Sequence, residues 1–175
     1  MSTILIKSER LYGRELQISD LPSFIDLQSN TKVMRFVGKN PMSAKECEAD
    51  LENIIRHYKA QDGFRVWGFF QLADDQMVGT GAIISDNKGN EIGFRLREKF
   101  WGNGYGVEIT QNLIKYGFEH LNLDNLFAEV DQKNIHSVKV LDKTISNKKA
   151  IWNEVFQSDD YYYDLSKSTY EKNRH

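Results

Sequence analysis

The chain has 175 residues, of which 40% are hydrophobic and 12% aromatic, and its formal net charge at pH 7 is -2. This length supports one sizeable hydrophobic core and predicts a single domain over residues 1–175. The near-neutral charge, with a pI of about 6.1, provides no strong positive field, so we expect no binding to nucleic acid. The only cysteine, Cys47, excludes an internal disulfide and a thiolate metal cluster within one chain.

The sequence contains no stretch that resembles a membrane segment or a secretory leader. The first residues lack the apolar core and the cleavage site of a signal peptide, and no run of eighteen apolar residues occurs. We therefore expect a cytoplasmic protein that does not bind membranes.

The first part of the chain alternates strand and helix signals. Residues 10–16 predict a strand, and residues 19–28 predict a helix with Ser19 or Asp20 as N-cap and Pro22 in its first turn. Residues 43–60 predict a second helix, because Ser43 and Glu46 form a capping box. One apolar stripe on that helix comprises Leu51, Ile54, Ile55 and Tyr58.

An antiparallel meander is expected next. Residues 66–84 predict two strands joined by a tight turn at 73–75, and residues 86–96 supply a second turn and a third strand. Alternation along this third strand separates two faces. One face carries Ile92, Phe94 and Leu96, and the other carries Glu91, Gly93 and Arg95.

The remaining elements are two helices and three strands. An amphipathic helix is predicted to follow the glycines at 102–106, and residues 134–143 predict another short helix. Residues 126–131 predict a strand, and the closing strand pair is expected within residues 148–165. The apolar side of the amphipathic helix is expected to comprise Val107, Thr110, Ile114, Gly117, Phe118 and Leu121.

Three glycines, Gly102, Gly104 and Gly106, stand at a strand-to-helix junction. The first N–H groups of a helix lack internal partners and carry the positive end of its dipole, and glycine lets an anion approach them closely. Because Gly106 is followed by Val107 and Glu108, the loop lacks the lysine and hydroxyl of a Walker A loop, and the spacing does not fit G-x-G-x-x-G. The glycines alone leave a phosphate-binding loop and a plain chain reversal equally open.

The residues around these glycines resemble a known family. The run Trp101–Gly106 is similar to the Q/R-x-x-G-x-G/A loop of the GNAT superfamily of acetyl-coenzyme A dependent N-acetyltransferases, with Trp101 replacing Gln or Arg. Residues 9–16, 33–38, 90–108 and 128–143 resemble the RimJ/RimL-type branch, in the same order along the chain. This resemblance implies an α+β GNAT fold, with a mixed, mostly antiparallel central sheet flanked by helices and a V-shaped opening between the central strands.

The resemblance also implies which residues hold acetyl-coenzyme A. Backbone groups near Phe94 and Leu96 would pair with the pantetheine amides, and N–H groups between Gly102 and Val107 would hold the pyrophosphate. The family's N-x-x-S pair corresponds to Asn134, near the pantetheine, and Ser137, near the sulfur, although Asn134 also suits plain N-capping. The predicted cofactor-binding set is Phe94, Leu96, Trp101, Gly102, Asn103, Gly104, Tyr105, Gly106, Val107, Asn134 and Ser137, and no metal is implied.

The implied reaction is direct transfer of acetyl to a primary amine in a ternary complex. The amine must lose a proton, and Glu91 is the candidate base, directly or through water, although a solvated carboxylate at the end of a strand is the competing interpretation. A backbone N–H near Leu96 would stabilise the oxyanion, and Ser137 could protonate the departing thiolate. The acceptor would be a peptide or protein N-terminus or a small amine.

Two other functions fit parts of the pattern. One is a noncatalytic module that binds or senses acyl-coenzyme A, and the other is a nucleotide-binding regulatory protein that uses the glycine loop for a different phosphate. A homodimer is plausible. The chain also departs from the family at residues 144–146, where Thr-Ile-Ser replaces the usual Leu-Gly-Phe turn, so we expect a differently built turn without an αL cap or the phenylalanine anchor.

Overall fold

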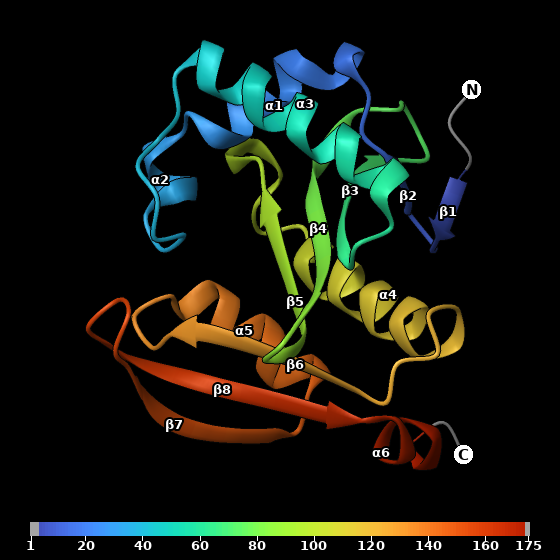
Figure 1. Ribbon diagram of the computed structural model, residues 1–175, viewed down its shortest axis with the longest axis vertical. Helices are drawn as coiled ribbons and strands as arrows, with labels where there is room; N and C mark the ends of the chain where they lie inside the picture. Colours follow the sequence, from blue (N-terminus) through green and yellow to red (C-terminus); the bar gives the residue numbers. More distant parts are fainter. Residues whose placement is uncertain (1–3, 174–175) are drawn as a thin grey trace.

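The computed structural model describes residues 4–173, in which one eight-stranded sheet is flanked by helices (Figure 1). The strand order is β1-β2-β3-β4-β5-β6-β8-β7, and every neighbouring pair is antiparallel except β5 and β6, which are parallel. The predicted α+β class and mostly antiparallel sheet are therefore confirmed. The strands are β1 (Ile4–Lys7), β2 (Leu11–Glu15), β3 (Phe64–Gln71), β4 (Met77–Asp86), β5 (Gly89–Leu96), β6 (Asn125–Asp131), β7 (Asn147–Asn153) and β8 (Ser158–Ser166). The helices are η1 (Ile18–Asp20), α1 (Leu21–Gln28), α2 (Thr31–Met34), α3 (Ala44–Ala60), η2 (Glu98–Phe100), α4 (Tyr105–Glu119), α5 (Ile135–Thr144) and α6 (Lys167–Lys172).

Helices cover both faces of the first five strands. Helices α1 and α3 pack on one face, and α4 packs on the other, with α5 beside it (Figure 1). Phe69 and Phe70 are neighbours in β3 but belong to different buried clusters, because successive side chains of a strand point to opposite faces. The strand therefore separates a core beneath α4 from a smaller core beneath α1 and α3.

The helix starts follow the sequence signals with one correction. The capping box of Ser43 and Glu46 is present at the start of α3. Asp20 does stand at the N-cap position of α1, but its side chain makes no capping bond there. Its carboxylate instead accepts two hydrogen bonds from Arg14 and one from the backbone N–H of Gln17.

The buried side of α4 differs in part from the predicted stripe. Thr110, Gly117 and Phe118 are buried as expected, but Val107 is only partly buried. Ile109 and Leu113, which the predicted stripe omits, are both fully buried. The helix therefore presents a wider apolar face to the sheet than the expected stripe.

The turn after α5 is built without glycine, as the unusual residues at 144–146 predict. Ile145 follows the helix in an extended conformation (φ -133°, ψ 123°), and its N–H donates to the Leu141 carbonyl. The Thr144 hydroxyl lies within hydrogen-bonding distance of the carbonyls of Val140 and Leu141. Ile145 is 2% exposed and joins the core beneath α4, so the turn keeps an apolar anchor although the phenylalanine is absent.

A contact joins the loop after α2 to the hairpin between β7 and β8. Gly38, in the loop after α2, has φ +71°, and a Cβ built on it would lie 2.3 Å from a ring atom of Phe156 at the tip of the β7–β8 hairpin. The Phe156 ring therefore rests directly on the glycine backbone.

Within residues 4–173, no helix is long and apolar enough to cross a membrane.

We predict that Ile145→Ala destabilises the protein by about 2–5 kcal/mol, because it empties a buried site in the core. Chemical denaturation measures this free energy of unfolding. The matched control is Val155→Ala, since Val155 is 75% exposed, and its effect should stay within about 0.5 kcal/mol. Equal effects of the two changes would show that Ile145 does not anchor the turn.

Candidate active site

The two central parallel strands meet at one point and then separate. Glu91 of β5 and Phe127 of β6 are the only residue partners recorded between these strands among residues 4–173, and the strands point in different directions in Figure 1. Helix α4 comes after β5 along the chain, and α5 comes after β6. Because the strands are parallel and meet near their starts, the beginnings of both helices belong to the diverging end. This is the V-shaped opening that the sequence predicts.

The edge of β5 that faces this opening carries backbone groups without strand partners. Arg97 donates its N–H to the Val78 carbonyl, and the antiparallel register then directs every second residue of β5 toward β4. The N–H and C=O groups of Phe94 and Leu96 consequently point away from β4, beyond the pair of Glu91 with Phe127. The Leu96 carbonyl is already used, because it accepts a hydrogen bond of 2.9 Å from the Trp101 indole. Leu96 therefore offers only its N–H.

The glycine loop presents N–H groups at the start of α4. Gly102 and Gly104 have φ values of +79° and +78°, in the left-handed region that glycine tolerates. Gly104 is the N-cap and supplies no side-chain cap. Within the described residues, no acceptor is recorded for the N–H groups of residues 102–107. A Cβ on Gly102 would meet no atom within 4 Å, so the loop surface is open to an anion.

Ser8 and Arg10, between β1 and β2, hold the glycine loop in place through contacts that the sequence did not indicate. Arg10 donates to both oxygens of Glu108 and to the Asn103 carbonyl, and its guanidinium lies 4.6 Å from the centre of the Tyr105 ring. Ser8 donates to the same carboxylate. Burial opposes the charge of Glu108, but these hydrogen bonds outweigh burial and lower its pKa. Because these partners are 98 to 100 residues apart, no local pattern could reveal them.

Two of the predicted cofactor residues also have structural roles. The Tyr105 side chain is buried and its hydroxyl accepts a hydrogen bond from Gln71, so only its backbone faces the opening. A Cβ on Gly106 would lie 3.0 Å from the Phe94 ring and 3.1 Å from Val140. Gly106 therefore lets α4 approach both β5 and α5.

The predicted N-x-x-S pair lies in the first turn of α5. The Asn134 side chain accepts from the Ser137 N–H at 3.3 Å, so it is an N-cap. No partner for the Ser137 hydroxyl is recorded among residues 4–173, and its side chain is partly exposed. His136, for which the sequence analysis predicts no role, lies beside Trp101 with a ring separation of 6.3 Å.

Glu91 lies at the point where β5 and β6 meet. Its side chain is exposed to solvent, but the surrounding protein still desolvates the carboxylate. This burial is the first cause of its raised pKa, followed by the nearby charges of Glu129 and Asp86, while Lys88 opposes them. A raised pKa brings a carboxylate closer to the value that suits a general base.

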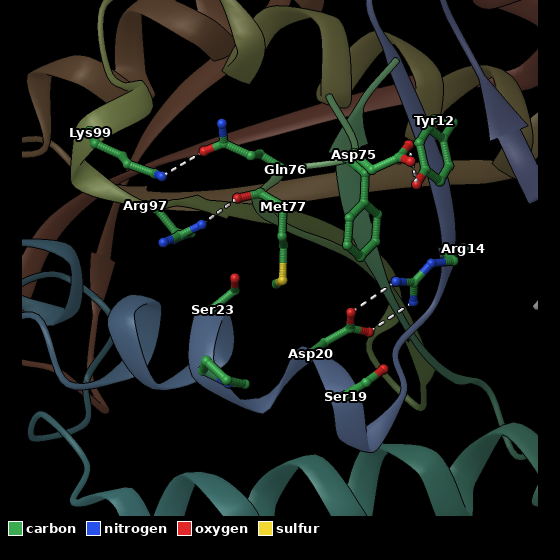
Figure 2. A pocket seen from close by; sticks show the side chains of 12 residues that line it. Tyr12, Arg14, Ser19, Asp20, Ser23, Asp75, Gln76, Met77, Arg97 and Lys99 are labelled. Atoms are coloured by element: carbon green, nitrogen blue, oxygen red, sulfur yellow. Dashed lines mark hydrogen bonds and ion pairs between the residues drawn. The ribbon is translucent and has the colours of Figure 1, made fainter. Parts of the chain in front are cut away.

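A separate polar depression lies between β2, the β3–β4 turn and the start of α1 (Figure 2). None of the predicted site residues lines it. Its charged groups already pair within the protein, Arg14 with Asp20 and Lys99 with the side chain of Gln76. We assign it no catalytic role.

Among the described residues, no cluster of three His, Cys, Asp or Glu could hold a metal ion.

We predict that Gly104→Val weakens acetyl-coenzyme A binding at least about tenfold, because a β-branched residue disfavours the left-handed φ that aims the loop N–H groups. Calorimetry gives the dissociation constant, and circular dichroism checks that the fold persists. Gln111→Ala, on the exposed side of α4, is the control. Unchanged affinity in folded Gly104→Val would rule out the loop as the pyrophosphate site.

Comparisons with known proteins agree with this geometry. Residues 10–144 match the family described as "Acetyltransferase (GNAT) domain". "Uncharacterized N-acetyltransferase p20" of Bacillus licheniformis is 26% identical over 171 residues, which cover 93% of this chain and 96% of that protein. The crystal structure of a GNAT-family acetyltransferase from Bacillus anthracis superposes with a TM-score of 0.80 at 22% identity, covering 93% of this chain and 98% of the other. Spermidine N-acetyltransferase from Vibrio cholerae, solved in complex with CoA and spermine, gives 0.79 at 19% identity over 92% and 98% of the two chains. The chain therefore belongs to the GNAT family of acetyltransferases and has the fold of that family.

Proposed function

We propose that this protein transfers acetyl from acetyl-coenzyme A to a primary amine by direct attack in a ternary complex, and that it belongs to the RimJ/RimL-type branch. The observation that carries the proposal is the run of N–H groups at residues 102–107 without recorded acceptors, at the diverging end of β5 and β6. A helix start of this kind suits a pyrophosphate. Beside it, the outward-facing edge of β5 suits the amides of an extended pantetheine arm.

The residues present fit this cosubstrate. The loop N–H groups would hold the pyrophosphate, and the outward groups of Phe94, with the N–H of Leu96, would pair with the pantetheine. Trp101 ties the loop to the strand through the Leu96 carbonyl, so both binding surfaces keep a fixed relative position. Asn134 fixes the first turn of α5 and thereby the position of Ser137.

For the proposed acetyl transfer, the protein must accept a proton and stabilise developing charge. In the proposed step the amine nitrogen bonds to the acetyl carbon, the carbon–sulfur bond breaks, and the nitrogen loses one proton. Glu91 would accept this proton, directly or through a water molecule. A backbone N–H on the outward-facing edge of β5 would stabilise the oxyanion, and the Ser137 hydroxyl would lie near the departing sulfur. A thiolate with a pKa of about 8.5 also leaves without help, so Ser137 would mainly orient it.

The proposed acceptor is a peptide or protein N-terminus or a small amine. The Vibrio cholerae spermidine N-acetyltransferase, which shares the fold, was solved in complex with CoA and spermine, and this supports an amine as the acceptor. A cytoplasmic location and a homodimer stay predictions from the sequence.

Calorimetric titration with acetyl-coenzyme A, using ATP and NAD as controls in the same buffer, tests the first half of this proposal. We expect selective binding of the coenzyme, followed by thiol release when amines are added. Binding without turnover on any amine would indicate a noncatalytic acyl-coenzyme A module. Preference for ATP or NAD would indicate a nucleotide-binding protein and contradict the proposal.

Glu91→Gln should lower turnover and remove the rising limb of the pH–rate profile, with little change in coenzyme affinity. The active form of the base is the carboxylate, so wild-type activity should rise with pH through a pKa above the ordinary 4.5. An unchanged pH profile would remove Glu91 from the mechanism.

The same substitution should increase stability at neutral pH. The folded protein binds the Glu91 proton more tightly than the unfolded chain does, so its free energy of unfolding falls as pH rises from the ordinary to the raised pKa. Glutamine removes the repulsion with Glu129 and Asp86. Thermal unfolding at pH 4 and pH 7.5 measures the difference, which should favour the variant only at the higher pH.

A further inference from the structure

The face of β5 opposite α4 carries an open space between two charged side chains. Glu91, Gly93 and Arg95 share this face, because alternate residues of a strand point the same way. A Cβ built on Gly93 would meet no atom within 4 Å. The proposed base, Glu91, therefore lies on one side of this space and Arg95 on the other.

Arg95 has no carboxylate partner among the described residues. Its one recorded hydrogen bond, 2.7 Å long, goes to the side-chain carbonyl of Gln28, which is a neutral group. The Gln28 amide in turn donates to Asp50 at 3.3 Å, so this acid lies near Arg95 but forms no ion pair with it. Arg95 forms none of the ion pairs recorded between residues 4 and 173.

Burying the Arg95 guanidinium without a direct carboxylate partner costs free energy. Burial lowers the pKa of Arg95, and the charge of Asp50 only opposes that effect. Buried charges in proteins are usually paired directly. No fully buried side-chain nitrogen in the described residues lacks a partner, so the remaining guanidinium nitrogens of Arg95 keep contact with solvent. The guanidinium is thus desolvated on one side and still accessible on the other.

The opposite end of the space has the opposite charge. The charges of Glu129 and Asp86 act on Glu91 and favour a cation nearby, with Lys88 as the opposing charge. A protonated amine arriving at this end would find two further carboxylates besides the base. The face therefore offers a negative end for an ammonium group and a positive end for an anion.

We infer that the acceptor is an amine that also carries a carboxylate, with the amine directed toward Glu91 and the carboxylate bound by Arg95 across the open space at Gly93. This inference rests on the proposed acetyltransferase function and specifies the acceptor of that same site. Arginine binds a carboxylate through two parallel N–H donors, which supplies both affinity and orientation.

The spacing favours an acceptor with several bonds between its two groups. Glu91 and Arg95 are four residues apart, which corresponds to roughly 13 Å between their Cα atoms in a strand. Side chains on one face leave the strand in similar directions, so the two charged ends stay well separated. Both ω-amino acids and peptides with an acidic side chain near the N-terminus have this chemistry.

Matched acceptors that differ only in charge test the inference. We would measure binding in the presence of CoA, and turnover with acetyl-coenzyme A, for 4-aminobutyrate and 6-aminohexanoate against their carboxamides. A second arm compares short peptides that differ only in Glu or Gln at the second position. In at least one of the two arms, the wild-type protein should prefer the acceptor with the carboxylate over its uncharged partner by about tenfold or more. The arm that shows this preference identifies the acceptor as a small amino acid or as a peptide.

Variants assign this preference to Arg95. Arg95→Met should reduce the ratio between carboxylate and carboxamide to about one without changing the affinity for acetyl-coenzyme A, and Arg95→Lys should retain part of it. Gly93→Ala should raise the acceptor KM with little loss of stability, because its methyl group enters the open space. The Gly93→Ala variant keeps the test decisive if Arg95→Met does not fold.

Failure of the inference is distinguishable from failure of the proposed function. Turnover of amines with no preference for the carboxylate in either arm would overturn the role of Arg95 while leaving an N-acetyltransferase. An equal preference in wild type and folded Arg95→Met, or an unchanged acceptor KM in Gly93→Ala, would also overturn it. Carboxylate-selective binding without turnover would support Arg95 and contradict the transferase proposal.

Discussion

The separation of two parallel strands is the constraint on which the site depends. Within a continuous sheet, the N–H and C=O groups of Phe94 and Leu96 would be paired with β6. Because β5 and β6 share only the pair Glu91 and Phe127 among the described residues, these groups lose that partner. Unpaired backbone groups are unfavourable unless water or a ligand satisfies them. The opening is therefore an edge of unpaired main-chain groups, which suits the proposed coenzyme.

The structure around this edge keeps the strands apart without letting them move freely. Gly106 brings α4 against β5 and α5, and Trp101 connects the glycine loop to the last residue of β5. Arg10 ties the same loop to the N-terminal strands through the Asn103 carbonyl. The geometry of the proposed coenzyme site thus depends on side chains whose own polar groups are satisfied within the protein.

Local patterns predicted most of the fold and the open backbone groups of the proposed site. The capping box at Ser43, the turns of the meander and the strand-to-helix junction at the glycines depend on neighbouring residues, so they can be read from short stretches. The short helices α2 and α6 were not predicted. Neither were the contacts of Arg10 with Glu108 or of Arg95 with Gln28, because these partners are 98 and 67 residues apart. Only tertiary structure brings such pairs together.

The contact between Gly38 and Phe156 links the evolution of two distant positions. A side chain at position 38 would have to occupy the volume of the Phe156 ring, since even its first carbon would approach within 2.3 Å. In a related chain, a larger residue after α2 therefore requires a smaller residue at the hairpin tip or a shift of the whole hairpin. The two positions should change together rather than independently, although 118 residues separate them.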